Sequence, residues 1–287
     1  MKKIRQIITQ IKTDTTATSD EFNDMLWQLI CYSPKMPLRL LQEQLLNDAE
    51  KFSLKVKDEH FANMELIFQG FKWGNGTRKV LITHGWGSKA ADFIDIITAL
   101  REIDNLEIIA FDAPGNGSSE GELSNLLLYI AAIKAIIKDY GKPDILIGHS
   151  LGAMANVIAL KEMMITPSLL ISLTPLIRLK ENFEASMNAV DIPQITQNRF
   201  LKSFEDKFDM PASHYNLNDW YSFDAQLKHW LAYDENDLIS TYNYIEEFLN
   251  KYPFIISQNY DGVGHERILK SPQLINDLVE LINVNIN

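Results

Sequence analysis

The segment Gly148 to Gly152, which reads Gly-His-Ser-Leu-Gly, has the residue types and spacing of a sharp turn that carries a nucleophile. It follows the apolar run 145–147 and leads into an apolar-rich stretch that starts at Ala153, so we expect a buried strand to turn directly into a helix here. Glycines avoid steric clashes in such a bend, and the helix that follows points free N–H groups back at the serine. The pattern predicts that the Ser150 hydroxyl attacks an acyl carbon.

A serine nucleophile needs a general base, and the base needs an orienting acid. Three histidines follow Ser150 in the chain, namely His214, His229 and His265. His214 falls in a stretch without an expected strand, and His229 begins an expected strand, which would put its ring at the wrong end of a sheet. His265 lies in a glycine-containing loop after the last expected strand. We therefore expect His265 to be the base.

The acid is expected between the serine and the histidine, in the loop after the strand expected at 230–233. Three carboxylates compete in that loop: Asp234, Glu235 and Asp237. We expect Asp237 to be the acid, with Asp234 as the alternative. The other two carboxylates are expected to stay solvated or to cap a helix that begins near Ser240.

Acyl transfer also needs hydrogen-bond donors for the oxyanion of the tetrahedral intermediate. Leu151, the residue after the nucleophile, would supply one backbone N–H. The second would come from the loop 84–88, which reads His-Gly-Trp-Gly-Ser, with the Trp86 N–H as the natural donor because its glycine neighbours let the backbone approach a substrate closely. We expect His84 to order this loop rather than to act as a second base.

Strands and helices that alternate along the chain must position these residues. Strands separated by helices of ten or more residues imply a parallel sheet with crossover helices, and short strands that are polar on neither face fit a sheet covered on both sides. The expected strands are 64–70, 80–83, 106–111, 145–147, 169–173, 230–233 and 254–257; the expected helices are 21–31, 38–52, 90–103, 123–140, 153–164 and 274–282.

Taken together, these motifs resemble those of the α/β-hydrolase fold, from about residue 60 to the end. The resemblance rests on four segments: the loop 84–86, the turn 148–152 around Ser150 (the nucleophile elbow), the Gly-x-Gly-His pattern that ends at His265, and residues 112–119, which read Asp-Ala-Pro-Gly-Asn-Gly-Ser-Ser. It implies a mostly parallel central sheet flanked by helices, a structural turn at Asp112, and no metal or organic cofactor. It also supports Asp237 as the acid, although Leu-Ile-Ser follows it where the family often has Val-Pro.

The resemblance and the periodicity together suggest the domain organisation. Residues 1–58 are expected to form an N-terminal helical extension that packs on the core, and residues 59–287 the hydrolase domain. A strandless stretch at about 176–227 would be a helical lid over the crevice at the carboxyl ends of the strands. Its Phe200, Phe204 and Phe208 recur at four-residue spacing, which fits a helix packed against the body or, alternatively, rings that line an acyl pocket.

Composition limits the remaining possibilities. The chain has 287 residues, 46% hydrophobic and 23% charged, and a net charge of −11, which argues against nucleic acid and anionic membrane surfaces as partners. Cys31 is the only cysteine, so no intrachain disulfide can form, and we expect it to be a small buried hydrophobe. No apolar run approaches the roughly 18 residues of a membrane span, and we expect a cytoplasmic protein. No cysteine–histidine pattern predicts a metal site.

The predicted function is therefore that of a serine hydrolase acting on a small-molecule ester or similar acyl substrate. Thioesterase, amidase or aminopeptidase, C–C hydrolase and cofactor-free perhydrolase activities use the same machinery and stay open. A serine at the elbow excludes the haloalkane dehalogenases and epoxide hydrolases of the family, which use an aspartate there. The rival from another class is a catalytically silent ligand-binding protein with the same fold. No motif names the substrate or the oligomeric state.

Overall fold

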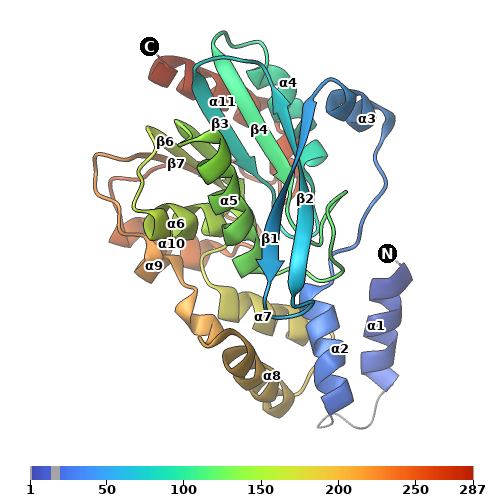
Figure 1. The fold of residues 1–287 in the computed structure, drawn as a ribbon. Coiled ribbons are helices and arrows are strands. Elements are labelled where there is room, and N and C mark those ends of the chain that lie inside the picture. Colours follow the sequence, from blue (N-terminus) through green and yellow to red (C-terminus); the bar gives the residue numbers. More distant parts are fainter. Residues whose placement is uncertain (1, 14–19, 287) are drawn as a thin grey trace.

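An eight-stranded sheet forms the centre of the computed structural model, which describes residues 2–13 and 20–286 (Figure 1). The strand order is β1-β2-β4-β3-β5-β6-β7-β8. The pairs from β4 to β8 are parallel, whereas β2 pairs antiparallel with both β4 and β1, so the predicted mostly parallel sheet is confirmed. The strands are β1 (Glu50–Asp58), β2 (Met64–Trp73), β3 (Arg78–Thr83), β4 (Leu106–Asp112), β5 (Ile145–His149), β6 (Leu169–Leu173), β7 (Lys228–Tyr233) and β8 (Ile256–Asn259).

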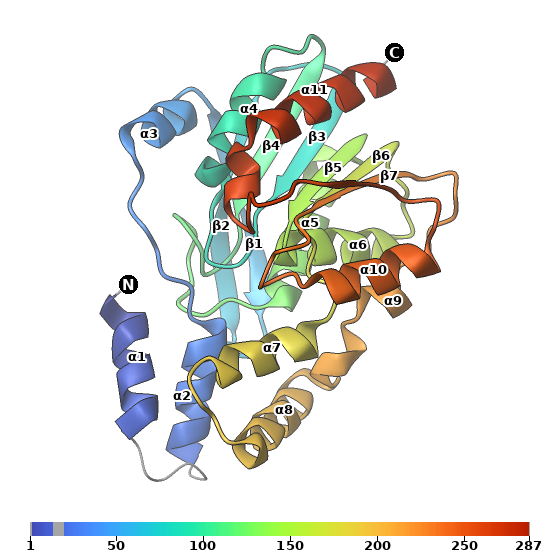
Figure 2. The same cartoon turned by 180° about the vertical axis from the view of Figure 1, so that it is seen from behind.

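Helices cover both faces of this sheet, as the short apolar strands require (Figures 1 and 2). Alternate residues of β5 divide between two cores: Leu146 packs with α5 and α6, and Ile145 and Ile147 pack with α4 and α11. The helices are α1 (Lys2–Thr13), α2 (Asp20–Cys31), α3 (Leu40–Asn47), α4 (Ile94–Leu100), α5 (Leu126–Tyr140), α6 (Leu151–Met163), α7 (Leu179–Asn188), α8 (Gln194–Phe208), α9 (Leu217–Trp220), α10 (Tyr242–Lys251) and α11 (Pro272–Ile286), with short 3-10 turns η1 (Ala90–Phe93), η2 (Ala212–His214) and η3 (Arg267–Lys270).

The expectation of helix throughout the N-terminal 58 residues is wrong at its end. Helix α3 stops at Asn47, and β1 then pairs with β2 along its whole length, from Glu50 opposite Lys72 to Asp58 opposite Met64. The reason is a period of two in the sequence, because apolar residues alternate with polar ones at 52, 54 and 56, which is a strand pattern. The first strand of the sheet therefore lies before the expected boundary at residue 59.

Residues 174–227 between β6 and β7, which we call the β6–β7 segment, contain helices and no named strand, as the sequence predicted. Its helix α8 packs against α2 of the N-terminal region. The Trp27 ring lies 4.7 Å from that of Phe200, 6.0 Å from that of Phe204 and 5.9 Å from that of Phe208, centroid to centroid. The phenylalanine stripe thus packs on a residue that is about 170 positions away in the sequence, and α2 lies beside α7 and α8 in both views (Figures 1 and 2).

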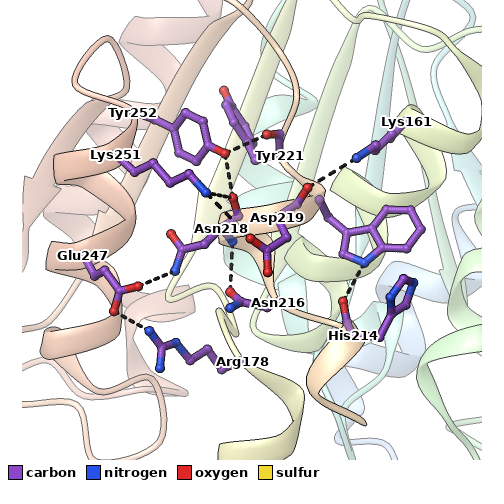
Figure 3. A network of polar contacts seen from close by, with 11 residues as sticks. Lys161, Arg178, His214, Asn216, Asn218, Asp219, Tyr221, Glu247, Lys251 and Tyr252 are labelled. Carbon is purple, nitrogen blue, oxygen red and sulfur yellow. Dashed lines mark hydrogen bonds and ion pairs between the residues drawn. The ribbon is translucent and has the colours of Figure 1, made fainter. Parts of the chain in front are cut away.

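The end of the same segment is held by polar contacts around Asn218 (Figure 3). The Asn218 side chain donates to Glu247 at 3.1 Å, and the Asn218 backbone carbonyl accepts from Lys251 at 2.5 Å and from the Tyr252 hydroxyl at 2.8 Å. Glu247 also forms an ion pair with Arg178 at the start of the segment. Both ends of the β6–β7 segment are therefore tied to α10, while α8 rests on α2.

Candidate active site

Ser150 stands on a strained turn between β5 and α6. Its φ of 52° and ψ of −120° are unusual for a residue with a Cβ atom, and such strain persists only where the surroundings impose it. The Ser150 N–H donates to the Leu173 carbonyl at 3.0 Å, and its carbonyl accepts from Leu176 at 3.2 Å. Hydrogen bonds to the backbone of Leu173, at the end of β6, and of Leu176, just after it, therefore hold the turn at Ser150 in place.

The turn also depends on close backbone approaches that only glycine permits. A Cβ atom on Gly152 would lie 2.4 Å from the carbonyl oxygen of His84 and 2.5 Å from that of Thr83. A Cβ atom on Gly85 would lie 2.7 Å from His149 Nδ1. The loop after β3 is thus packed directly on the elbow, which is the arrangement expected of an oxyanion loop.

His265 and Asp237 come together from two different loops. His265 Nδ1 lies 2.6 Å from Asp237 Oδ2, and the side chains are 10% and 1% exposed, respectively. The other oxygen, Oδ1, accepts the N–H groups of Ile239 at 2.8 Å and Ser240 at 3.1 Å. Burial by itself raises the pKa of the Asp237 carboxyl, but the hydrogen bond and charge of His265, helped by these two N–H donors, outweigh it and hold the pKa below its usual value. Asp237 is therefore ionised and accepts from Nδ1.

Asp234 has a different partner. Its carboxylate accepts the N–H of Asn236 at 2.9 Å and the N–H of Gly264 at 2.6 Å. It is 1% exposed, so it is not solvated as we expected of a carboxylate that does not serve as the acid, whereas Glu235 is exposed as expected. Helix α10 starts after Thr241, which makes no side-chain cap. Asp234 ties the acid loop to the loop of His265, whereas Asp237 reaches the imidazole itself.

The predicted site residues meet at one cavity of about 840 Å³. Ser150 and His265 both line it, and so do Trp86 and Leu151, the two expected sources of oxyanion donors. Such a volume suits a small organic ligand, since pockets of this kind usually measure about 300–1,000 Å³. Ser150, Trp86, Leu151 and His265, which is hydrogen-bonded to Asp237, therefore gather around a single cavity.

The remaining histidines that the sequence offered serve other contacts. His229 is buried on β7 between the hydroxyls of Ser172 and Tyr221, at 2.9 Å and 3.1 Å, and burial lowers its pKa to about 3. His214 lies in η2, where its carbonyl accepts from the Trp220 indole at 2.9 Å (Figure 3). Neither residue is among those that line the cavity of Ser150.

His84 and Asp112 order the loops on which the site rests. His84 Nε2 accepts the Ala113 N–H at 2.9 Å, and its Nδ1 lies 2.7 Å from the Gly85 carbonyl, to which it donates in that tautomer. The Asp112 carboxylate accepts the N–H groups of Ala90 at 2.8 Å and Ser118 at 2.7 Å. These contacts agree with the structural roles expected for both residues.

Sequence reasoning missed His149, which contacts the loop of His265. Its Nε2 donates to the His265 carbonyl at 2.9 Å, and the two rings lie 4.8 Å apart. Its Nδ1 is buried and has no hydrogen-bond partner in the part of the chain that the structure describes. Burial, followed by the nearby charge of His265, lowers the pKa of His149 to about 3, so the ring is neutral. The only sequence feature that could have singled out His149 is its position next to Ser150. The residues around it do not indicate a partner 116 positions away in the chain.

Two further features of the described residues bear on metal binding and membrane insertion. Among residues 2–13 and 20–286, no group of three or more histidine, cysteine or carboxylate side chains is placed to share a metal ion. Within the same part of the chain, no helix has the length and apolar character that crossing a bilayer requires.

Comparisons with known proteins agree with this fold. The model of the alpha/beta hydrolase family matches residues 80–265. A monoglyceride lipase from Rattus norvegicus is 30% identical over 126 residues, a match that spans 40% of this chain and only 41% of that lipase.

Solved structures resemble the chain over most of its length. An esterase from Pyrococcus furiosus superposes with a TM-score of 0.61 at 16% identity, covering 90% of this chain and 97% of the esterase. An esterase from Thermogutta terrifontis gives 0.59 at 16% identity, with 82% and 99% covered. Alpha/beta hydrolase domain-containing protein 10 from mouse gives 0.59 at 18% identity, with 82% and 98% covered. At these identities the likeness shows a shared fold.

Proposed function

Because the chain belongs to the alpha/beta hydrolase family, we propose that it is a serine hydrolase that cleaves an ester or related acyl substrate through an acyl-enzyme. The observation that carries the proposal is that Ser150, on its strained turn, and His265, paired with Asp237 at 2.6 Å, line the same cavity. The esterase and lipase names of similar proteins support the reaction class.

Each side chain has a role in this mechanism. The Ser150 hydroxyl oxygen attacks the substrate carbonyl carbon, and His265 Nε2 accepts the hydroxyl proton. Asp237, being ionised, holds His265 in the tautomer with the proton on Nδ1 and stabilises the imidazolium that forms. His265 then gives its proton to the leaving-group oxygen as the bond from the carbonyl carbon to that oxygen breaks, and an acyl-Ser150 ester remains.

Water then hydrolyses the acyl-enzyme, and His265 again acts first as a base and then as an acid. His265 takes a proton from the water, the hydroxide attacks the acyl carbon, and the proton returns to Ser150 as the acid product leaves. In both halves of the reaction, the backbone N–H groups of Leu151 and Trp86 stabilise the oxyanion, each worth about 3 kcal/mol of the barrier.

Removal of the nucleophile tests the proposal. Ser150→Ala should abolish p-nitrophenyl ester hydrolysis and labelling by a fluorophosphonate probe, while circular dichroism stays that of the wild type. The matched control is Ser172→Ala, because Ser172 also contacts a histidine, at 2.9 Å, but lies buried away from the cavity. Full activity in folded Ser150→Ala would overturn the assignment. An unlabelled wild type would favour the silent binding protein instead.

The bond that is cleaved needs its own measurement. Esters, thioesters, aminoacyl amides and C–C substrates all pass through an oxyanion, so one site geometry serves them all. Comparing kcat/KM for an ester, a thioester and an amide of the same acyl group separates these activities, and we expect the ester to be the best substrate.

A further inference from the structure

We propose that the N-terminal helix α2 is part of the substrate site, where it forms one wall of a pocket for a medium- or long-chain acyl group. This inference rests on the proposed function and names its substrate class: an amphiphilic acyl ester rather than an acetyl ester. The pocket lies between α2 and the helices α7 and α8 of the β6–β7 segment.

The lining of the cavity carries the inference. The residues that line it include Leu29, Ile30 and Cys31 at the end of α2, and Phe183 of α7 with Phe204 and Phe208 of α8. All six side chains are buried or half-buried. The same cavity contains Ser150, so an acyl carbon at the serine can extend its chain into this apolar part. A cavity of about 840 Å³ is far larger than an acetyl group requires.

Cys31 presents an apolar surface to this pocket. Its side chain is buried, and burial raises the pKa of the thiol, with Lys207 near the end of α8 and Asp58 near the β1–β2 turn as the charges that act on it. A protonated, buried thiol behaves as a small hydrophobe. Cys31 therefore serves as a wall residue whose size sets the room available to the chain.

The wall is held rigidly in place. The Cys31 carbonyl accepts the Ser124 N–H at 2.8 Å, which ties the end of α2 to the body of the protein. Trp27, one turn earlier, packs against the rings of Phe204 and Phe208 and is not among the residues that line the cavity. Because the wall is preorganised, its shape can select among acyl chains at little entropic cost.

Charged side chains elsewhere on the lining give the site its polar character. Arg39 precedes α3, Lys270 follows the loop of His265, and Lys89 pairs with Asp92 at 3.2 Å. The Gln42 amide donates to Asp92 at 2.9 Å and so fixes α3 beside η1. An ester with an apolar chain and a polar alcohol part matches a cavity with both kinds of lining.

A chain-length series tests the proposal. For the wild type, kcat/KM for p-nitrophenyl esters should rise from acetate to octanoate and decanoate. Cys31→Phe should lower the decanoate value about tenfold or more and change the acetate value little, because only the long chain reaches the wall. The matched control Asp24→Ala, at an exposed position of α2 that is not among the lining residues, should keep the long-chain preference. Cys31→Met, whose flexible side chain fills less space, should give an intermediate result if the phenylalanine variant folds poorly.

A binding measurement separates this proposal from the proposed function. The affinity of the Ser150→Ala variant for the decanoate anion, measured by calorimetry, should fall about tenfold when Cys31→Phe is added to it. A wild type that prefers the acetate ester, or a Cys31→Phe variant that slows hydrolysis of all esters equally, would contradict the role of α2 as a pocket wall. Neither result would contradict the proposed hydrolase function. Absence of any Ser150-dependent hydrolysis, with decanoate binding still sensitive to Cys31, would overturn the proposed function alone.

Discussion

Asp237 reaches the imidazole of His265 at 2.6 Å, while Asp234, three residues earlier in the same loop, instead accepts the N–H of Gly264 at 2.6 Å. Two buried carboxylates of one loop thus serve two neighbouring residues of another. Asp237 contacts the ring that would move protons, whereas Asp234 contacts the backbone next to His265 and not its ring. Different consequences follow from removing each charge.

Asp237→Asn should lower kcat for p-nitrophenyl esters about 10³- to 10⁴-fold, because an amide in that place favours the wrong histidine tautomer. Asp234→Asn should cost much less activity, since His265 keeps its acid, but should lower the free energy of unfolding by about 1–3 kcal/mol through the buried Gly264 N–H. Steady-state kinetics and urea unfolding of both variants check this. Equal losses of kcat would contradict the distinct roles.

His149 and His229 should make the fold sensitive to acid. Both have a folded pKa of about 3, against about 6.5 for an unfolded chain, so between these values the unfolded state binds protons that the folded state does not. The free energy of unfolding therefore falls as pH drops from 6.5, by about 1.4 kcal/mol per pH unit for each histidine. Urea unfolding from pH 7 to pH 4.5 measures this slope.

His229→Asn isolates one of these contributions, because His229 lies away from the cavity. The variant should show a slope shallower than the wild type by up to about 1.4 kcal/mol per pH unit. An unchanged slope would mean that His229 titrates normally in the folded protein.

Gly152→Ala should be strongly destabilising, because its Cβ would lie 2.4 Å from the His84 carbonyl oxygen. Relief requires a shift of the start of α6 against the loop after β3, which costs about 1–3 kcal/mol or more. Gly262→Ala is the control. The φ of Gly262 is +72°, but no atom of residues 2–13 or 20–286 lies within 4 Å of the added carbon, so only a conformational cost of about 1 kcal/mol applies. Thermal unfolding should rank Gly152→Ala as clearly the less stable of the two.

Trp27→Ala should lower the free energy of unfolding by about 3–5 kcal/mol, since the ring is 5% exposed and packs against three phenylalanines of α8. The surface ion pair between the same two helices, Arg199 with Asp20 at 2.8 Å, provides the control. Arg199→Ala should change stability by less than about 1 kcal/mol because Asp20 is 96% exposed. A small effect of Trp27→Ala in urea unfolding would show that α2 is only loosely attached.

Local patterns in the sequence predicted much of the architecture. The apolar run before Ser150 and the helix after it are both present, because five consecutive residues hold enough information to define a strand-to-helix turn. By contrast, the prediction of helix up to residue 52 is wrong where β1 begins at Glu50. Its apolar positions Phe52, Leu54 and Val56 span too few residues to outweigh the helical pattern that precedes them, and only pairing with β2 resolves the ambiguity.

The sequence by itself determined the residue types of the site and their order: a serine at an elbow, an acidic loop and then a histidine loop, on a mostly parallel sheet. Tertiary structure decided which of Asp234 and Asp237 touches His265, because loop residues three apart differ in direction and not in composition. It also brought His149 to the His265 carbonyl and α2 to the cavity of Ser150, over separations of more than one hundred residues. Contacts of that range arise from packing, which no local spacing encodes.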